Sequence, residues 1–498
     1  MRKRFSIAVP GRTVSLAASL AALSFLAGCK PVGPNYTRPP LTAPPVYKEA
    51  GAPSVTAPPP NPDGGSWKPA TPSDGMLKGK WWEIYNDPQL NSLEERIAGN
   101  NQAVRQAVEN YLAARDQVQS VRSQLYPQIS LGPGYSYNRL SHNEPNASTA
   151  TKTSFNDLLL TGTGSWEPDF WGKIRRNIEA AHANMQASAA EQANLSLSLE
   201  AEMAADYFQL RGLDSQIRLL KNTVTDLESQ LDLTQRRLSG GVATGVDVAQ
   251  AQTELETIKA QLVDVSVARA QFEHAIGTIA NYTLSSFSIP FSPLDLSMPN
   301  VPLGVPSQLL ERRPDIAAAE RQAQAANAQI GVAISAYYPT ISLNGTGGFE
   351  STHGGTWISG PSALWSLGAS ATELLFDAGQ RRALTDQARH LYEAQAAGYR
   401  NTVFLAFQDV EDNLSTLRTL NQEEAVEKRA VDAAQHSLDL SNQRYKGGVT
   451  SYLEVITAET TLLADQRTLT DLQTRQFSAS VQLVRSLGGG WDDSQLPK

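Results

Sequence analysis

Four short segments of the chain alternate between apolar and small polar residues. In the first of them Ile129, Leu131 and Tyr135 stand on alternate positions, with serine and glycine between them. Successive side chains of a strand point to opposite faces, so each segment predicts a strand with one apolar and one polar face. The pattern is typical of transmembrane β-barrel strands, and a soluble hairpin with one buried face is the alternative. The segments are 128–138, 156–166 (a weaker case), 340–350 and 364–372.

Two much longer stretches follow a helical pattern. No proline occurs between Pro168 and Pro290, or between Pro361 and Pro497. Apolar residues recur there at near-helical spacing, while Gln, Ser, Thr and Asp fill the other positions. Residues 173–237 alone would extend about 100 Å as a helix. Because the apolar stripe is narrow, such helices predict a coiled-coil rod or the wall of a water-filled tube.

The folded part of the chain repeats itself. Leu-Tyr-Pro-Gln-Ile-Ser-Leu at 125–131 recurs as Tyr-Tyr-Pro-Thr-Ile-Ser-Leu at 337–343. Arg-Leu-Ser-Gly-Gly-Val at 237–242 recurs as Arg-Tyr-Lys-Gly-Gly-Val at 444–449, and the paired glycines suit a turn that reverses the chain. Self-similarity over such a long period indicates two copies of one structural unit.

The repeat divides the chain into five predicted parts. Each copy contains a helix, a strand pair and a long helical hairpin. The parts are a lipoprotein signal peptide at 1–28, a lipidated proline-rich linker at 29–80, repeat 1 at 81–300 (strand pair 128–168, hairpin 173–280), repeat 2 at 301–488 (strand pair 339–376, hairpin 379–487) and a C-terminal tail at 489–498.

The N-terminus has the features of an export signal. Basic residues at 2–4 precede an apolar stretch at 14–27, which ends in Leu-Ala-Gly before Cys29. This ending resembles the bacterial lipobox, which implies that Cys29 becomes the lipidated first residue of the mature chain. An ordinary signal peptide with a chance cysteine is the alternative. Lys30 follows, and in lipoproteins an Asp at that position usually marks retention in the inner membrane, so the outer membrane is expected.

Composition and charge exclude several classes of function. The chain of 498 residues carries a formal net charge of -8, which argues against a nucleic-acid partner. With one cysteine it has no internal disulfide. Its six histidines fit no zinc spacing, and no Gly-rich phosphate loop or nucleophile motif stands out. We therefore predict no catalytic residue, no metal site and no cofactor.

The number of predicted strands has a consequence for assembly. Four strands cannot close a barrel, for which about eight is the smallest useful number. An open strand edge in lipid would leave unpaired N–H and C=O groups, each costing several kcal/mol. The chain must therefore assemble with copies of itself, and three copies give 12 strands and 12 helical columns.

Several motifs resemble the TolC-type outer-membrane efflux proteins, in particular their NodT-type lipoprotein branch. The most specific is Leu-Leu-Glu-Arg-Arg-Pro-Asp-Ile at 309–316, followed by Ala319-Glu320, Ile330-Gly331 and Tyr338-Pro339. Gly-Pro-Asn-Tyr at 33–36 and Trp81-Trp82 resemble the opening of the family's chains. The resemblance implies an α+β membrane protein, a TolC-like homotrimer. Its 12-stranded outer-membrane β-barrel, with four strands per protomer, continues into a long 12-helix periplasmic α-barrel.

The family's function is passive and implies specific partners. The resemblance implies a lipid-anchored outer-membrane exit duct with a periplasmic extension, which is not an enzyme. An inner-membrane RND-type pump and a periplasmic adaptor would deliver small molecules such as drugs, toxic compounds or metals. The alternatives are the exit duct of a type I secretion system and a structural helical lipoprotein that bridges the outer membrane and the cell wall.

The resemblance also places a docking end and a gate at the two interhelical turns. The residues expected to contact the adaptor are Gly241, Val242, Ala243, Thr244, Gly448, Val449 and Thr450. The residues expected at the periplasmic gate are Asp247, Glu454, Leu453 and Thr457. Asp247 and Glu454 occupy matching places in the two copies, so three protomers would set six carboxylates around a narrowing pore. Thr457 stands where the family often has Asp, and acidic residues at a helix start also suit the helix dipole without any gate.

Overall fold

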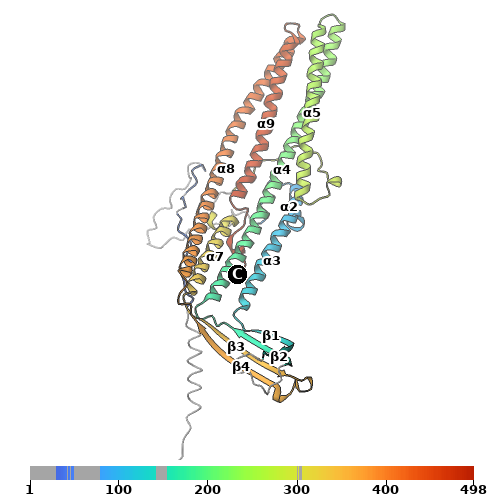
Figure 1. Cartoon of the computed structure of the whole chain (residues 1–498). Coiled ribbons are helices and arrows are strands. Elements are labelled where there is room, and N and C mark those ends of the chain that lie inside the picture. The colour runs from blue at the N-terminus through green and yellow to red at the C-terminus, as the bar shows by residue number, and fades with distance from the viewer. Residues whose placement is uncertain are drawn as a thin grey trace, which may run out of the picture. The chain divides into compact units, whose positions relative to one another are not determined.

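The structure is a computed structural model that describes residues 30–41, 43–44, 46–49, 79–141, 154–299, 301 and 306–498 (Figure 1). Cys29 lies outside the described residues. The elements in chain order are η2 (Trp81–Tyr85), α2 (Pro88–Asn100), α3 (Gln102–Ser123), β1 (Gln128–Arg139), β2 (Ser154–Trp166), α4 (Lys173–Ser239), α5 (Gly245–Ile279), η3 (Leu284–Ser286), η4 (Pro306–Gln308), α6 (Leu309–Arg312), α7 (Pro314–Ser335), β3 (Thr340–Ser351), η5 (Gly354–Thr356), η6 (Gly360–Ser362), β4 (Ala363–Thr372), α8 (Gln380–Lys446), α9 (Tyr452–Ser486) and η7 (Asp493–Gln495).

The internal repeat reappears as matched elements. Helices α4 and α8 have 67 residues each, and α5 and α9 have 35 each. Helices α3 and α7 have 22 residues each, and β1 and β3 have 12 each. The two copies therefore form the same succession of helix, strands and long helical hairpin.

Contacts divide the chain into two compact units that cut across the repeats. Unit 1 comprises Met1–Pro39, Leu112–Ala187 and Ala319–Gly398, and unit 2 comprises Pro40–Tyr111, Ser188–Ala318 and Tyr399–Lys498. Unit 1 contains the strands, and unit 2 contains the ends of both long hairpins. Each unit is thus built from both copies of the repeat.

The strands of unit 1 form one antiparallel sheet in the order β1-β2-β3-β4. Its register puts the apolar positions of neighbouring strands side by side: Tyr135 pairs with Leu158, and Leu160 pairs with Phe349. On the other face Ser130 pairs with Thr163, and their hydroxyls lie 2.7 Å apart. The alternation seen in the sequence therefore gives the sheet one mainly apolar and one mainly polar face, although Leu159 lies on the polar one.

The apolar face of the sheet is exposed in the single chain. Ile129 and Leu131 on β1 and Trp365 and Leu367 on β4 have most of their surface open. Within the described residues, β1 and β4 are edge strands with no further strand beside them. A sheet with this exposed apolar face and two open edges is complete only with additional strands or an apolar solvent.

The core of unit 2 is aromatic and lies where η2 and α2 pack on α4 and α9. The ring centres of Tyr85 and Phe477 each lie 4.8 Å from that of Phe208 and 6.3 Å from each other, so the three rings form one cluster. Tyr85 and Phe208 are fully buried. Asp87 begins α2 by accepting hydrogen bonds from the backbone of Gln89 and Leu90.

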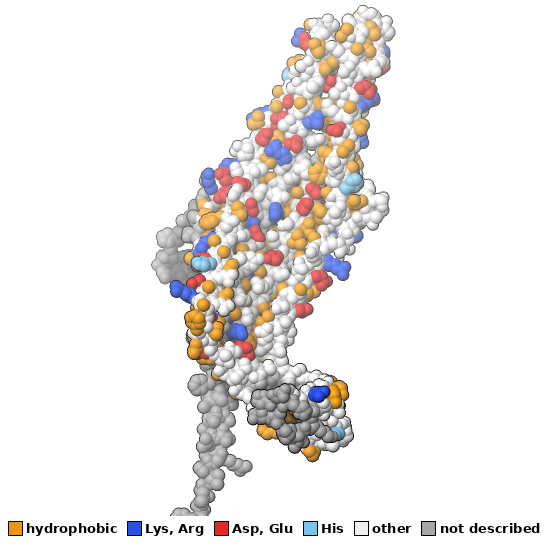
Figure 2. Space-filling model, viewed as in Figure 1, with side chains coloured by type: hydrophobic (Ala, Val, Ile, Leu, Met, Phe, Trp, Pro, Cys, Tyr) orange, Lys and Arg blue, Asp and Glu red, His pale blue; other side chains and the backbone are white. Residues whose placement is uncertain are grey.

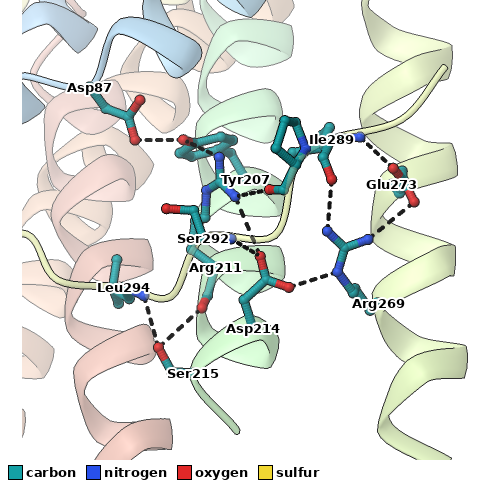
Figure 3. Close-up of polar contacts among 11 residues, drawn as sticks. Asp87, Tyr207, Arg211, Asp214, Ser215, Arg269, Glu273, Ile289, Ser292 and Leu294 are labelled. Carbon is teal, nitrogen blue, oxygen red and sulfur yellow. Dashed lines mark hydrogen bonds and ion pairs between the residues drawn. The ribbon is translucent and has the colours of Figure 1, made fainter. Parts of the chain in front are cut away.

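A buried ionic network fixes the segment that follows α5 to the hairpin of repeat 1 (Figure 3). The carboxylate of Asp214 accepts hydrogen bonds from Arg211, Arg269 and the backbone of Ser292. Arg211 also donates to the Pro290 carbonyl at 2.8 Å, and Arg269 to the Ile289 carbonyl at 2.8 Å. The network therefore holds α4, α5 and the chain at 289–292 in one arrangement.

The long helices are not membrane spans. Even the two 67-residue helices contain no described stretch that is long and apolar enough to cross a bilayer.

Candidate functional site

The two hairpin turns of unit 2 have nearly identical geometry. Gly241 has φ of +74° and Gly448 has φ of +72°, a backbone region that favours glycine. The amide of Val242 donates to the Arg237 carbonyl at 2.9 Å, and that of Val449 to the Arg444 carbonyl at 3.0 Å. Each glycine therefore ends its long helix in the same left-handed cap and reverses the chain.

Apolar side chains project from both turns. Val242 is 69% exposed and Val449 is 72% exposed. Val246 and Leu453, one turn further along, are exposed as well. On the face drawn in Figure 2, charged side chains of both signs are scattered over the helices and gather in no large patch of one sign. The turns thus offer small and apolar groups for contact, and the predicted docking role of residues 241–244 and 448–450 stays a prediction.

The predicted gate residues Asp247 and Glu454 have different surroundings. The Thr244 hydroxyl accepts from the Asp247 amide at 3.2 Å, while the Asp247 carboxylate accepts from the Thr244 amide at 2.8 Å, a complete capping box. Ser451 makes no such side-chain cap, and the Glu454 carboxylate instead lies 3.7 Å from Arg444. Thr457 donates its hydroxyl to the Leu453 carbonyl within α9. Their predicted role at a gate is a matter for experiment, and Asp247 has a structural role besides.

Next to the turns lies a contact between the two hairpins that the sequence did not reveal. The guanidinium of Arg237, at the end of α4, lies 4.7 Å from the centre of the Tyr445 ring and donates to the Lys446 carbonyl at 3.2 Å. Tyr445 packs on Tyr452 with ring centres 5.3 Å apart. We call Arg237, Tyr445, Tyr452, Gln230 and Glu459 the latch.

The lower part of the latch is a chain of hydrogen bonds between α4 and α9. The Tyr452 hydroxyl donates to Gln230 Oε1 at 3.0 Å, and Gln230 Nε2 donates to Glu459 Oε1 at 3.3 Å. Glu459 is 7% exposed, and its burial raises the pKa of its carboxyl to about 7, with Glu254 and Asp226 adding to the rise. Gln230 and Glu459 thus join the hairpins through a group that titrates near neutral pH.

Several buried polar atoms of the latch lack hydrogen-bond partners. Among the described residues, Arg237 Nε, the Tyr445 hydroxyl and Glu459 Oε2 are buried without a hydrogen-bond partner. Buried polar atoms without partners cost free energy, so this arrangement is stabilised less than its number of contacts suggests.

Differences between the two copies of the repeat mark the latch residues in the sequence. Arg237 and Arg444 occupy equivalent places, but Tyr445 stands where the first copy has Leu238, and Tyr452 where it has Gly245. These departures from internal symmetry give only the second copy the two rings. Within the described residues, no group of three or more His, Cys, Asp or Glu side chains is arranged to hold a metal ion.

A family model described as "Outer membrane efflux protein" matches residues 93–281 and 305–489. The toluene efflux pump outer membrane protein TtgF of Pseudomonas putida is 30% identical over 477 residues, which is 95% of this chain and 97% of that protein. The probable outer membrane lipoprotein SilC of Salmonella typhimurium is 27% identical over 95% of this chain and 98% of its own length. Among solved structures, the outer-membrane channel OprN matches with a TM-score of 0.82 and 27% identity, over 92% of this chain and 99% of that one.

Proposed function

Because the chain belongs to the outer membrane efflux protein family, it is the outer-membrane channel of an efflux system, and we propose that it works as a passive homotrimeric duct without catalysis. Its fold is the TolC-like one predicted from the sequence, with four strands per protomer for a 12-stranded barrel. The sheet carries the proposal: its exposed apolar face suits lipid, and its two open edges suit the strands of neighbouring protomers. Three protomers close the ring.

The proposed cargo is a class of small molecules that an inner-membrane pump of the RND type passes to a periplasmic adaptor. TtgF, a relative that matches almost the whole chain, is named for the efflux of toluene, which supports a small organic compound as cargo. The turns at 241–244 and 448–450 are the proposed contact with the adaptor, because their exposed valines and small residues allow close approach by another helical tip. Asp247, Leu453, Glu454 and Thr457 are the proposed lining of the gate, with the latch holding it closed.

The proposed anchor in the outer membrane is a lipid on Cys29. The lipobox-like ending of the N-terminal signal supports it, and the name of the relative SilC includes the word lipoprotein. Each buried CH₂ group of an acyl chain contributes about 0.8 kcal/mol to membrane affinity. The lipid thus adds to the anchoring that the barrel itself provides.

Reconstitution tests the proposal directly. The full chain is purified in detergent, its mass in the micelle is measured, and its ion conductance is recorded in planar bilayers. We expect a trimer that conducts ions. We also expect that cells lacking their own outer-membrane channel regain toluene tolerance only when the chain is expressed together with an adaptor and a pump. A stable monomer, or a trimer without conductance under any condition, contradicts the proposal.

A further inference from the structure

A cavity of about 430 Å³ lies in unit 2, where the C-terminal tail meets α3 and α4. Its wall includes Tyr111 on α3, Glu200 on α4 and Trp491 in the tail. None of the residues that line it belongs to the hairpin turns, the latch or the sheet. Its size is within the usual range for a site that takes a small molecule.

Packing holds the tail side of the cavity in place. Gly488, Gly489 and Gly490 have φ of +95°, +57° and +86°, a backbone region that favours glycine. The amide of Trp491 donates to the Gly488 carbonyl at 3.0 Å. Leu496 is buried against alanines of α4 and α7, and Trp491 packs on the same cluster. This wall is therefore formed by the fold itself and does not need a ligand to shape it.

Glu200 supplies the charge of the cavity. Within the described part of the chain, it is the one charged residue of the lining. Its Oε2 accepts a hydrogen bond from the indole N–H of the buried Trp81 at 3.0 Å. Burial raises the pKa of the Glu200 carboxyl to about 7, with the Trp81 hydrogen bond acting in the opposite direction. Lys80, next to the lining residue Gly79, pairs with Glu95, so no described cation balances Glu200.

A second carboxyl adds to the need for a positive charge. Glu94 on α2 is 1% exposed, and neither of its oxygens has a hydrogen-bond partner among the described residues. Burial, together with the charge of Glu200, holds the pKa of Glu94 well above its usual range. A buried carboxylate is unfavourable unless it is paired. A cation brought to Glu200 would therefore offset the repulsion between the two groups.

The other walls suit an organic cation better than a metal ion. Tyr111 and Trp491 have aromatic rings, and such rings attract an ammonium group that lies within about 6 Å of them. Calcium, by contrast, takes about six to eight oxygen ligands, and the lining has one carboxylate to offer. A carboxylate beside two aromatic side chains is the combination that binds ammonium groups.

We propose that this cavity is a binding site for a small organic cation, a quaternary or protonated amine, whose nitrogen pairs with Glu200 and lies between Tyr111 and Trp491. Because η2, α4 and the tail all meet near Glu200, the bound cation should also stabilise unit 2. The inference does not rest on the proposed duct function, since none of the lining residues belongs to the proposed gate or to the sheet.

Choline is a suitable probe, because its charge is permanent and a neutral analogue of the same shape exists, in which carbon replaces the nitrogen. The full chain, purified in detergent, is titrated with each compound, and binding is followed by the broadening of the methyl NMR signal of the probe. We expect choline to bind about tenfold more tightly than the neutral analogue, which corresponds to about 1.4 kcal/mol. Equal affinities, or no binding of choline, would overturn the proposal and leave the cavity to a protein side chain or to water.

The Glu200→Gln variant tests the carboxylate and keeps an oxygen for the Trp81 hydrogen bond. Its matched control is Glu202→Gln, because Glu202 is an exposed acid on the same helix and lies outside the lining. We expect about tenfold weaker choline binding in Glu200→Gln and unchanged binding in Glu202→Gln. Tyr111→Leu should weaken it several-fold through loss of the ring. Native affinity in Glu200→Gln contradicts the proposal.

The pH dependence of choline binding to the native chain covers the case in which Glu200→Gln does not fold. Choline requires ionised Glu200, so with a pKa of about 7 its affinity should rise about tenfold from pH 6 to pH 8. The other titratable groups nearby are Glu94 on α2, Tyr111 on α3 and Lys80, which Glu95 neutralises. Glu94→Gln should keep the dependence. Equal affinity of the native chain at both pH values overturns the proposal, and none of these outcomes depends on conductance or cargo.

Discussion

The Nε–H of Arg269 on α5 donates to the carboxylate of Asp214 on α4 at 2.6 Å, and Asp214 is fully buried (Figure 3). The equivalent positions of repeat 2 carry Asn421 and Gln476, whose side chains hydrogen-bond at 3.2 Å. The same pair of helix positions is therefore ionic in one copy and neutral in the other. Only the ionic version also holds the segment at 289–292.

Replacing Asp214 by Asn should destabilise the protein strongly. The change leaves the buried charge of Arg211 without its carboxylate partner and Arg269 with Glu273 alone, and breaking a buried pair typically costs about 3–5 kcal/mol. Denaturant or thermal unfolding of the purified chain measures the loss. The control is Asp295→Asn, since Asp295 pairs with Arg218 on the surface and its side chain is 67% exposed, which predicts less than about 1 kcal/mol. Similar losses in the two variants would contradict the importance of burial.

The sequence predicted the long helices and their turns well, for local reasons. Gly240-Gly241 interrupts a proline-free stretch with helical spacing, and the structure places the end of α4 at Ser239. The strands were equally easy to predict, because alternation over 128–138 follows from the two-residue period of side chains in a strand. In the structure β1 runs over Gln128–Arg139. Patterns formed by residues close together in the sequence can be recognised without knowledge of the fold.

The latch and the packing of residues 31–38 against Gly331 depend on contacts between distant parts of the chain. Arg237 and the Lys446 carbonyl that it reaches are 209 positions apart, and no local pattern marks either as a partner of the other. The motif Gly-Pro-Asn-Tyr at 33–36 suggested only a family resemblance, and its fit against Gly331 appears only when α4 and α7 pack. Asp247 illustrates the opposite case: its capping box with Thr244 is a local motif, although the sequence predicted there only an acidic residue that suits the helix dipole.

Removing the latch arginine should open the duct. Arg237→Ala abolishes the contact with the Tyr445 ring and the hydrogen bond to Lys446, while neighbouring Arg236 pairs with Asp232 inside its own helix. A loss of about 1.4 kcal/mol from the closed state would raise the ratio of open to closed channels tenfold. We expect single-channel recordings to show a several-fold higher open probability in Arg237→Ala and no change in Arg236→Ala. Identical recordings for both variants would show that Arg237 does not hold the gate closed.

Asp247 and Glu454 should differ in their effect on stability, although both are expected to alter conductance. Asp247→Ala breaks the capping box with Thr244 and should cost about 1 kcal/mol of folding stability. Glu454→Ala removes only an exposed ion pair with Arg444 and should leave stability within about 0.5 kcal/mol. Unfolding curves separate these outcomes, and bilayer recordings of the same two variants test the proposed gate. If neither variant changes cation conductance, the two carboxylates do not line the constriction.

Glu459 should make the latch sensitive to pH. Its carboxyl has a pKa raised to about 7 in the folded chain by burial, against about 4.3 in an unfolded chain. The folded state therefore holds a proton that the unfolded state loses between these values. Stability is unaffected by this group below about pH 4, decreases as the pH rises, and reaches its full loss above about pH 7.

The Glu459→Gln variant isolates this effect. The amide oxygen of Gln can still accept the hydrogen bond from Gln230, but it carries no charge at any pH. At 1.36 kcal/mol per pKa unit, the variant should be more stable than the native chain at pH 8 by on the order of 3 kcal/mol, and equal to it near pH 4. Unfolding at both pH values measures the difference, and Glu454→Gln at the exposed neighbouring site serves as the control.

The native channel should also open more readily at pH 8 than at pH 5, because ionised Glu459 lies near Glu254 and Asp226 and is disfavoured in the closed latch. A Glu459→Gln variant with the same pH dependence of opening as the native channel would assign that dependence to another group.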